Sequence, residues 1–217
     1  MVIGKPAPFV STFVDAVDAA IRTHQPQHAM SVTQRTWLAF CLTAVLVTNS
    51  ICWARFARAS LGTSALAALS WMFRHSKIPW EQLLVASVQV ILRHHGITAG
   101  SLVVDDTDNP RSKSAKTLAY LYKLRDKESG GYLCGQSLVF LLLVTPKISL
   151  PVGVVFSQPA PEISAWDRTA KTLKKQGVPT KQRPRKPAPN PHYPTKEQLA
   201  LRLLETFKAR PFNIRPP

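Results

Sequence analysis

The stretch SLVVDDTDNPR, residues 101–111, decides how the chain is interpreted. It opens with a short apolar, β-branched run that stops at Asp105 and Asp106. Asp108-Asn109-Pro110 follows, a combination typical of turns. The sequence therefore predicts a buried strand that ends in acidic residues, with a turn directly after it.

These acidic residues stand out because the chain is strongly basic. Of its 217 residues, 28 are Lys or Arg and 12 are Asp or Glu, which gives a net charge of +16. Clustered carboxylates repel one another unless a cation or hydrogen-bond donors neutralise them. One or two carboxylates, with water and phosphate, are how Mg²⁺ is usually held. The residues alone therefore allow either a magnesium site or a solvated acidic turn.

The basic residues predict a polyanionic partner, and nucleic acid is favoured over an anionic membrane. One group follows the acidic residues directly. A second run, from Arg168 to Lys186, holds eight Lys or Arg and no acid. We expect the DNA contacts to come from both groups, namely from Arg111, Lys113, Lys116, Lys171, Lys174, Lys175 and Arg183.

The sequence of residues 1–98 predicts a helical domain. Pro8 is expected to open the first helix, with Phe9, Phe13 and Val17 as its apolar stripe. Further helices are expected over 32–53, from Thr63 or Ser64 to Arg74, and from Pro79 to Gly96. The last two have the proportions of a helix-turn-helix, and ordinary packing in a bundle explains them equally well.

The uncharged run from Trp37 to Trp53 is at the short limit for a membrane span, and a buried helix is favoured. Cys41, Cys52 and Cys134 lack metal-ligand spacing and fit buried free thiols in a reducing compartment. We therefore expect a cytoplasmic, nucleoid-associated protein without a membrane partner.

The sequence of residues 99–217 predicts an α/β domain. After the strand at 101–106, strands are expected over 132–144 and 152–156, with a turn at Pro146-Lys147. A proline-rich, basic linker is expected over 157–194. A helix over 195–209, with Thr195 as its N-cap, completes the domain.

The segments VVDDTDNPRSKSAK, GGYLCGQSLVFLLLV and YPTKEQLALRLLETFKAR together resemble DDE transposases of bacterial insertion sequences. The resemblance spans roughly residues 30–215 and implies an α+β protein in which a helical, DNA-binding domain, residues 1–98, precedes an incomplete ribonuclease H-like domain. The family's first catalytic aspartate, a metal ligand, corresponds to Asp106, with Asp105 as the alternative ligand. The implied activity is cleavage and transfer of DNA strands at terminal inverted repeats with Mg²⁺ or Mn²⁺, and the family accommodates homodimers.

The family's second aspartate and its glutamate come after the helix that corresponds to 195–209. We therefore expect these 217 residues to be a truncated remnant that binds DNA without cleaving it, with an unpaired edge on strand 132–144. Two alternatives stay open. One is a free-standing regulatory protein that competes for transposon ends, and the other is a small basic membrane-associated protein.

Overall fold

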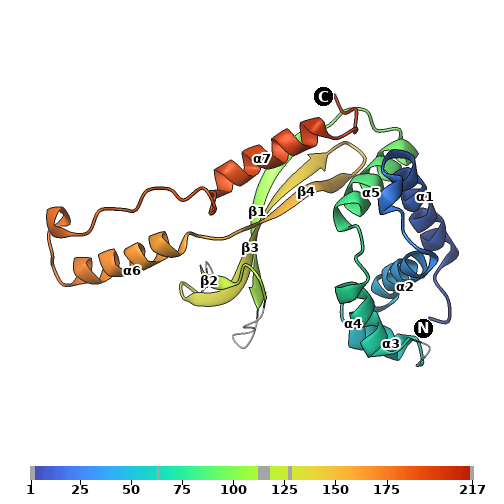
Figure 1. Ribbon diagram of the computed structural model, residues 1–217, viewed down its shortest axis with the longest axis horizontal. Coiled ribbons are helices and arrows are strands. Elements are labelled where there is room, and N and C mark those ends of the chain that lie inside the picture. The colour runs from blue at the N-terminus through green and yellow to red at the C-terminus, as the bar shows by residue number, and fades with distance from the viewer. Residues whose placement is uncertain (1–2, 63, 112–117, 127–128, 216–217) are drawn as a thin grey trace. The chain divides into compact units, whose positions relative to one another are not determined.

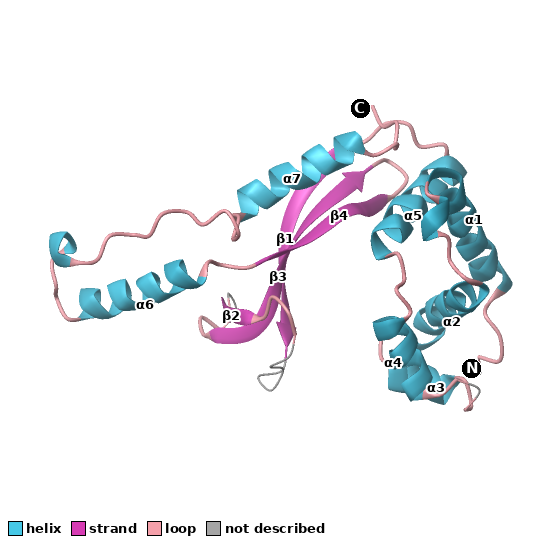
Figure 2. Ribbon diagram, in the orientation of Figure 1, coloured by secondary structure: helices cyan, strands magenta, loops and turns pink. Residues whose placement is uncertain are grey.

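The computed structural model describes residues 3–62, 64–111, 118–126 and 129–215. This part of the chain is mixed α+β, with seven α-helices and a four-stranded antiparallel sheet. It divides into two compact units, Met1–Thr98 and Ala99–Pro217. The first contains only helices and the second contains the whole sheet (Figure 2).

Local signals set several helix ends of the first unit. Its elements are α1 (Pro8–His24), the 3₁₀ turn η1 (Pro26–His28), α2 (Val32–Thr48), α3 (Trp53–Ala59), α4 (Leu66–His75) and α5 (Trp80–His95). Pro8 is the first residue of α1, where its missing N–H costs nothing. Gly96, with φ of 61°, ends α5 in the left-handed conformation. Both predicted ends are confirmed.

The single helix predicted over 32–53 is wrong, because the structure breaks it into α2 and α3. Asn49 follows α2 with φ of 44°, a left-handed conformation that asparagine tolerates and that ends a helix. The expected cap of α4 is wrong as well. That helix begins after Ala65 without a side-chain cap, and Thr63 lies outside the described residues.

The predicted core stripe of α1 is correct in part. Val17 is buried and Phe13 packs against the core, as predicted, but Phe9 is 68% exposed, and Val10, Val14 and Ile21 are buried instead. These residues also recur at helical spacing, so spacing could not exclude Phe9. Packing of α1 against α2 and α5 selects the valine stripe.

A buried carboxylate joins three segments of the first unit. Asp18 is 1% exposed and accepts a hydrogen bond of 2.7 Å from the backbone N–H of Met30. It also pairs with Arg22 at 2.7 Å and with Arg35 at 3.4 Å. A buried charge is tolerated only when paired in this way.

Within the described residues, no single helix is both long and apolar enough to cross a membrane. Taken together, α2 and α3 have sufficient length and apolar composition, but they are bent by 88° where they meet.

In the second unit the central strand is β3, which has partners on both edges (Figure 1). Its strands are β1 (Ser101–Arg111), β2 (Tyr122–Arg125), β3 (Tyr132–Val144) and β4 (Ser149–Ser157). One edge of β3 pairs with β1, and the other pairs with β4 and β2. The predicted unpaired edge on strand 132–144 is therefore wrong, since a β2 strand that the sequence did not reveal extends the pairing.

One face of this sheet is covered by α7 (Lys196–Ala209). Thr195 caps the helix reciprocally with Gln198, as predicted. Leu199 and Phe207 are buried, and a Cβ on Gly153 would lie 3.0 Å from Leu203 Cδ2. Because Gly153 is opposite Leu141 in the ladder, α7 covers the face that carries Leu141.

The linker predicted over 157–194 is wrong in part, because it contains helix α6 (Pro161–Lys175) and the 3₁₀ turn η2 (Thr180–Gln182). Apolar residues at helical spacing give α6 a half-buried side, formed by Ile163, Trp166, Ala170 and Leu173. The chain then returns beside it, and Trp166 Nε1 donates a hydrogen bond of 2.8 Å to the carbonyl of Pro184 (Figure 1).

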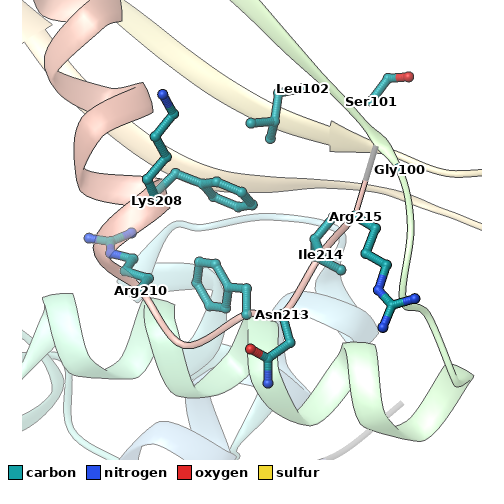
Figure 3. Close-up of a pocket in the computed structure, with 10 residues that line it drawn as sticks. Gly100, Ser101, Leu102, Lys208, Arg210, Asn213, Ile214 and Arg215 are labelled. Atoms are coloured by element: carbon teal, nitrogen blue, oxygen red, sulfur yellow. The ribbon is translucent and has the colours of Figure 1, made fainter. Parts of the chain in front are cut away.

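After α7 the chain comes back to the start of β1. Phe212 packs on Phe207 with ring centroids 5.2 Å apart. Arg215 then pairs with Ala99 in parallel, and its carbonyl accepts a hydrogen bond of 3.1 Å from Gly100 (Figure 3). The segment after α7 is therefore joined by a single parallel bridge to the residue pair before β1, beside a pocket of about 620 Å³.

Candidate functional site

The acidic cluster lies inside β1 and not at its end, so the predicted turn at Asp108-Asn109-Pro110 is wrong. The ladder with β3 continues from Ser101 to Arg111. Pro110 lacks an N–H, but β1 pairs with β3 along one edge only, and an edge strand tolerates proline. Long-range pairing therefore overrides the local turn signal.

The pleat of β1 separates Asp105 from Asp106. Asp106 is opposite Val139 and Asp108 is opposite Ser137, on the face that α7 covers. Asp105 is opposite Phe140, on the other face, because successive side chains of a strand alternate. Asp106, the predicted ligand, and Asp105, the predicted alternative, therefore lie on opposite faces, and Asp108 shares the face of Asp106.

A cation from α7 reaches the Asp106 carboxylate. Lys196, the first residue of the helix, donates from Nζ to Asp106 Oδ2. Burial lowers the pKa of Lys196, but the Asp106 hydrogen bond and the charges of Asp106 and Asp108 outweigh it, so the net pKa is raised. The ammonium thus neutralises part of the negative charge on this face of β1.

Beside this pair, two buried side-chain oxygens on residues opposite each other in the ladder have no hydrogen-bond partner among the described residues. They are Oδ1 of Asp108 and Oγ of Ser137, whose residue is fully buried. Unsatisfied buried oxygens cost free energy, and a bound cation would satisfy them. The oxygens of Asp106, Asp108 and Ser137 therefore fit a hard divalent cation such as Mg²⁺.

Of the three DNA contacts predicted near the acidic cluster, only Arg111 lies within the described residues. Arg111 lies on the opposite face from Asp106, and its Nε donates to Gln136 Oε1 at 3.4 Å. Lys113 and Lys116 lie outside the described residues. Arg111 therefore does not join Asp106 in one site.

Four of the eight cations in the second basic run lie on α6. Lys171, Lys174 and Lys175 are exposed there, and so is Arg168. Positions 168, 171 and 175 share one side of the helix, opposite its apolar side. Arg183 is half-buried, and its Nε donates a hydrogen bond of 2.9 Å to the carbonyl of Val178. This bond stabilises the segment that follows α6. The structure thus distinguishes four exposed cations on α6 from Arg183, which has a structural role.

Sequence reasoning missed Lys196, Asp108 and Ser137 as members of the site. Lys196 and Asp106 are 90 positions apart, and only the packing of α7 on the sheet brings them together. A signal for Asp108 did exist, because residues two apart on a strand share a face. No sequence signal indicated Ser137, because a single serine in an apolar strand has no distinctive spacing.

No protein-family model matches this chain, and neither a curated protein nor a solved structure gives a match. The function is therefore argued from the resemblance of its motifs and from the geometry of the site.

Proposed function

We propose that this chain is a DNA-binding protein derived from a DDE transposase, with a second unit that corresponds to the first part of a ribonuclease H-like domain. The observation that carries the proposal is the position of Asp106 and Asp108 on the α7-covered face of β1. The order of elements supports it. Four antiparallel strands are followed by α6 and α7, and Arg215 then forms a parallel bridge with Ala99, just before β1.

The cation of such a site would be Mg²⁺ or Mn²⁺, which polarises a phosphate and activates the attacking oxygen when two ions are bound. Asp106 and Asp108 would hold it, with Ser137 beside them. A two-metal site needs carboxylates from further segments, and the described residues contain no group of three or more His, Cys, Asp or Glu side chains that could hold a metal ion. We therefore propose that these residues bind DNA without cleaving it.

The exposed cations of α6 are the proposed contacts with the DNA backbone. Arg168 and Lys175 lie seven residues apart, about 10 Å along the helix axis. That length matches about three phosphates of one strand at 3.4 Å each. Together with the net charge of +16, this side of α6 favours binding through phosphates, and hence a weak dependence on sequence. The terminal inverted repeats implied by the resemblance are the proposed target.

The test is binding of a mixed-sequence DNA duplex across a salt series, followed by fluorescence anisotropy. Reversal of Arg168, Lys171 and Lys175 to Glu should weaken binding and reduce the salt slope by about 2 to 3, near 0.9 per lost phosphate contact. The matched control reverses exposed Lys5, Arg93 and Lys208, which changes the net charge equally. Absence of duplex binding by the unaltered chain at low salt overturns the proposed function, and equal losses in both variants overturn the role of α6.

A regulatory protein that competes for transposon ends is the second candidate. The Lys196–Asp106 ion pair favours it, because a lysine already neutralises the carboxylate that a metal would need. Mn²⁺ binding separates the two candidates. A transposase-derived metal site should bind Mn²⁺ in a way that Asp106→Asn and Asp108→Asn weaken, whereas a regulator without such a site should show no dependence on either residue.

A further inference from the structure

A groove with a volume of about 820 Å³ lies next to the acidic site. Its walls are the end of β4, the first turns of α7 and the returning proline-rich segment at 186–194, which we call the strap. This volume falls within the roughly 300–1,000 Å³ of sites that hold small organic ligands. The groove therefore has room for one or two nucleotides rather than for a duplex.

The charged residues that line the strap groove are all cationic. They are Lys186 on the strap and Lys196 and Arg202 on α7. Lys186 and Arg202 are exposed, and neither forms an ion pair within the described part of the chain. Two such cations, one on the strap and one on α7, favour an anionic ligand with repeated charges, such as a polynucleotide backbone.

Two aromatic rings complete the groove. Tyr122 comes from β2 and Tyr193 comes from the strap, and both are half-buried. A local turn presents Tyr193, since its N–H donates to the carbonyl of Asn190 at 2.9 Å. Bases stack on such rings without regard to sequence, and cations beside the rings bind the connecting phosphates.

The strap itself is preorganised. Pro187, Pro189, Pro191 and Pro194 all line the groove, and each fixes its own φ. Proline-rich segments favour an extended conformation without internal hydrogen bonds, so little entropy is lost when a ligand lies along them. This wall is therefore suited to an extended chain as a ligand.

Lys196 connects the groove to the acidic site, because it lines the groove and pairs with Asp106. We propose that the strap groove binds a short single-stranded stretch of DNA, with Tyr122 and Tyr193 stacked on bases and with Lys186, Lys196 and Arg202 on phosphates. The proposal rests on the proposed DNA-binding function. It places one strand end beside Asp106, with Lys196 as the residue shared by both sites.

The experiment measures fluorescence anisotropy of a labelled oligothymidylate of about six nucleotides, near the lower end of single-strand site sizes. Tyr193→Ala should weaken binding about 5- to 100-fold, as expected for loss of base stacking. Tyr193→Phe should retain binding, because the ring remains, and this variant also reports on folding. Tyr132→Ala is the matched control, since Tyr132 is an exposed tyrosine of the same unit that does not line the groove.

The outcomes separate this proposal from the previous one. Loss of oligothymidylate binding in Tyr193→Ala and in the pair Lys186→Gln with Arg202→Gln, with duplex binding retained, supports the strap groove. Unchanged binding in Tyr193→Ala overturns it. Equal competition by a glutamate oligomer of the same charge also overturns it, since the groove would then bind any acidic polymer.

Discussion

Lys196 on α7 and Asp106 on β1 form an ion pair across 90 positions of the chain. The pair joins the start of the helix to the middle of the strand and places a positive charge beside two carboxylates. Because Lys196 also lines the strap groove, it is the one side chain that links the acidic site to the proposed binding surface among the described residues.

The Lys196–Asp106 pair should contribute little to stability. Its side chains are 39% and 47% exposed, so solvent screens the charges. A double-mutant cycle with Lys196→Met and Asp106→Asn should give a coupling of less than about 1 kcal/mol. Urea unfolding near neutral pH measures it, and a coupling several times larger would contradict the exposed character of the pair.

The same pair predicts the direction of a pH effect. The pKa of Lys196 is raised in the folded chain above the ordinary lysine value of 10.5. Its contribution is therefore fully present below about pH 10 and is lost as pH rises through the raised pKa. The difference in unfolding free energy between the unaltered chain and Lys196→Met should shrink above that pH.

Asp18→Ala should destabilise the first unit strongly. The change leaves Arg35 without its buried partner and the Met30 N–H without an acceptor, at a cost of about 3–5 kcal/mol. Asp15→Ala is the control, since Asp15 also pairs with Arg35, at 3.3 Å, but its side chain is 64% exposed. That variant should lose less than about 1 kcal/mol. Thermal unfolding compares them, and equal losses would be inconsistent with a buried role for Asp18.

Gly135→Ala should destabilise the sheet. An added Cβ would lie 2.7 Å from the Asn109 carbonyl oxygen and 2.8 Å from Leu124 Cδ1. A backbone atom cannot move aside without disturbing the β1–β3 ladder, so we expect a loss of about 1–3 kcal/mol. Gly131→Ala is the control, because its new Cβ meets only the Ser129 side chain, at 3.3 Å. A chemical unfolding midpoint unchanged by Gly135→Ala would argue against this close approach.

Cys52 should react with iodoacetamide long before Cys41 does. The structure corrects the prediction of three buried thiols, since Cys41 is buried, Cys52 is exposed and Cys134 is intermediate. Burial raises the pKa of Cys41 to about 12. Backbone hydrogen bonds from Arg55 and Ala54 lower the pKa of Cys52, so more thiolate is present at any pH below 9. Mass spectrometry of a time course near pH 8 tests the order, and faster labelling of Cys41 would refute it.

The purified 217-residue chain should not cut or join DNA with Mg²⁺ or Mn²⁺. Asp106 and Asp108 supply one pair of carboxylates, and a two-metal mechanism needs more. Asp106→Ala should leave duplex binding unchanged, apart from a slight gain through lost repulsion of phosphates. Metal-dependent nicking that Asp106→Ala abolishes would show that other residues or a partner complete the site.

The sequence by itself determined those features whose cause lies within a few residues. Pro8 begins a helix, Gly96 ends one and Thr195 caps one, because each acts on the backbone next to it. Strand 132–144 was predictable for the same reason, since its long apolar run is bounded by glycine and proline. These signals needed no knowledge of any distant segment.

The tertiary structure alone decided what surrounds Asp106. Because β1 pairs with β3, it continues as a strand through Asp108-Asn109-Pro110, where the local sequence favours a turn. The register of that ladder places Asp106 and Asp108 on one face and Asp105 on the other. A shift of one residue would exchange the two faces, so register cannot be inferred from local composition. Lys196 reaches Asp106 only because α7 packs on that face, where burial of Leu199 and Phe207 holds the helix.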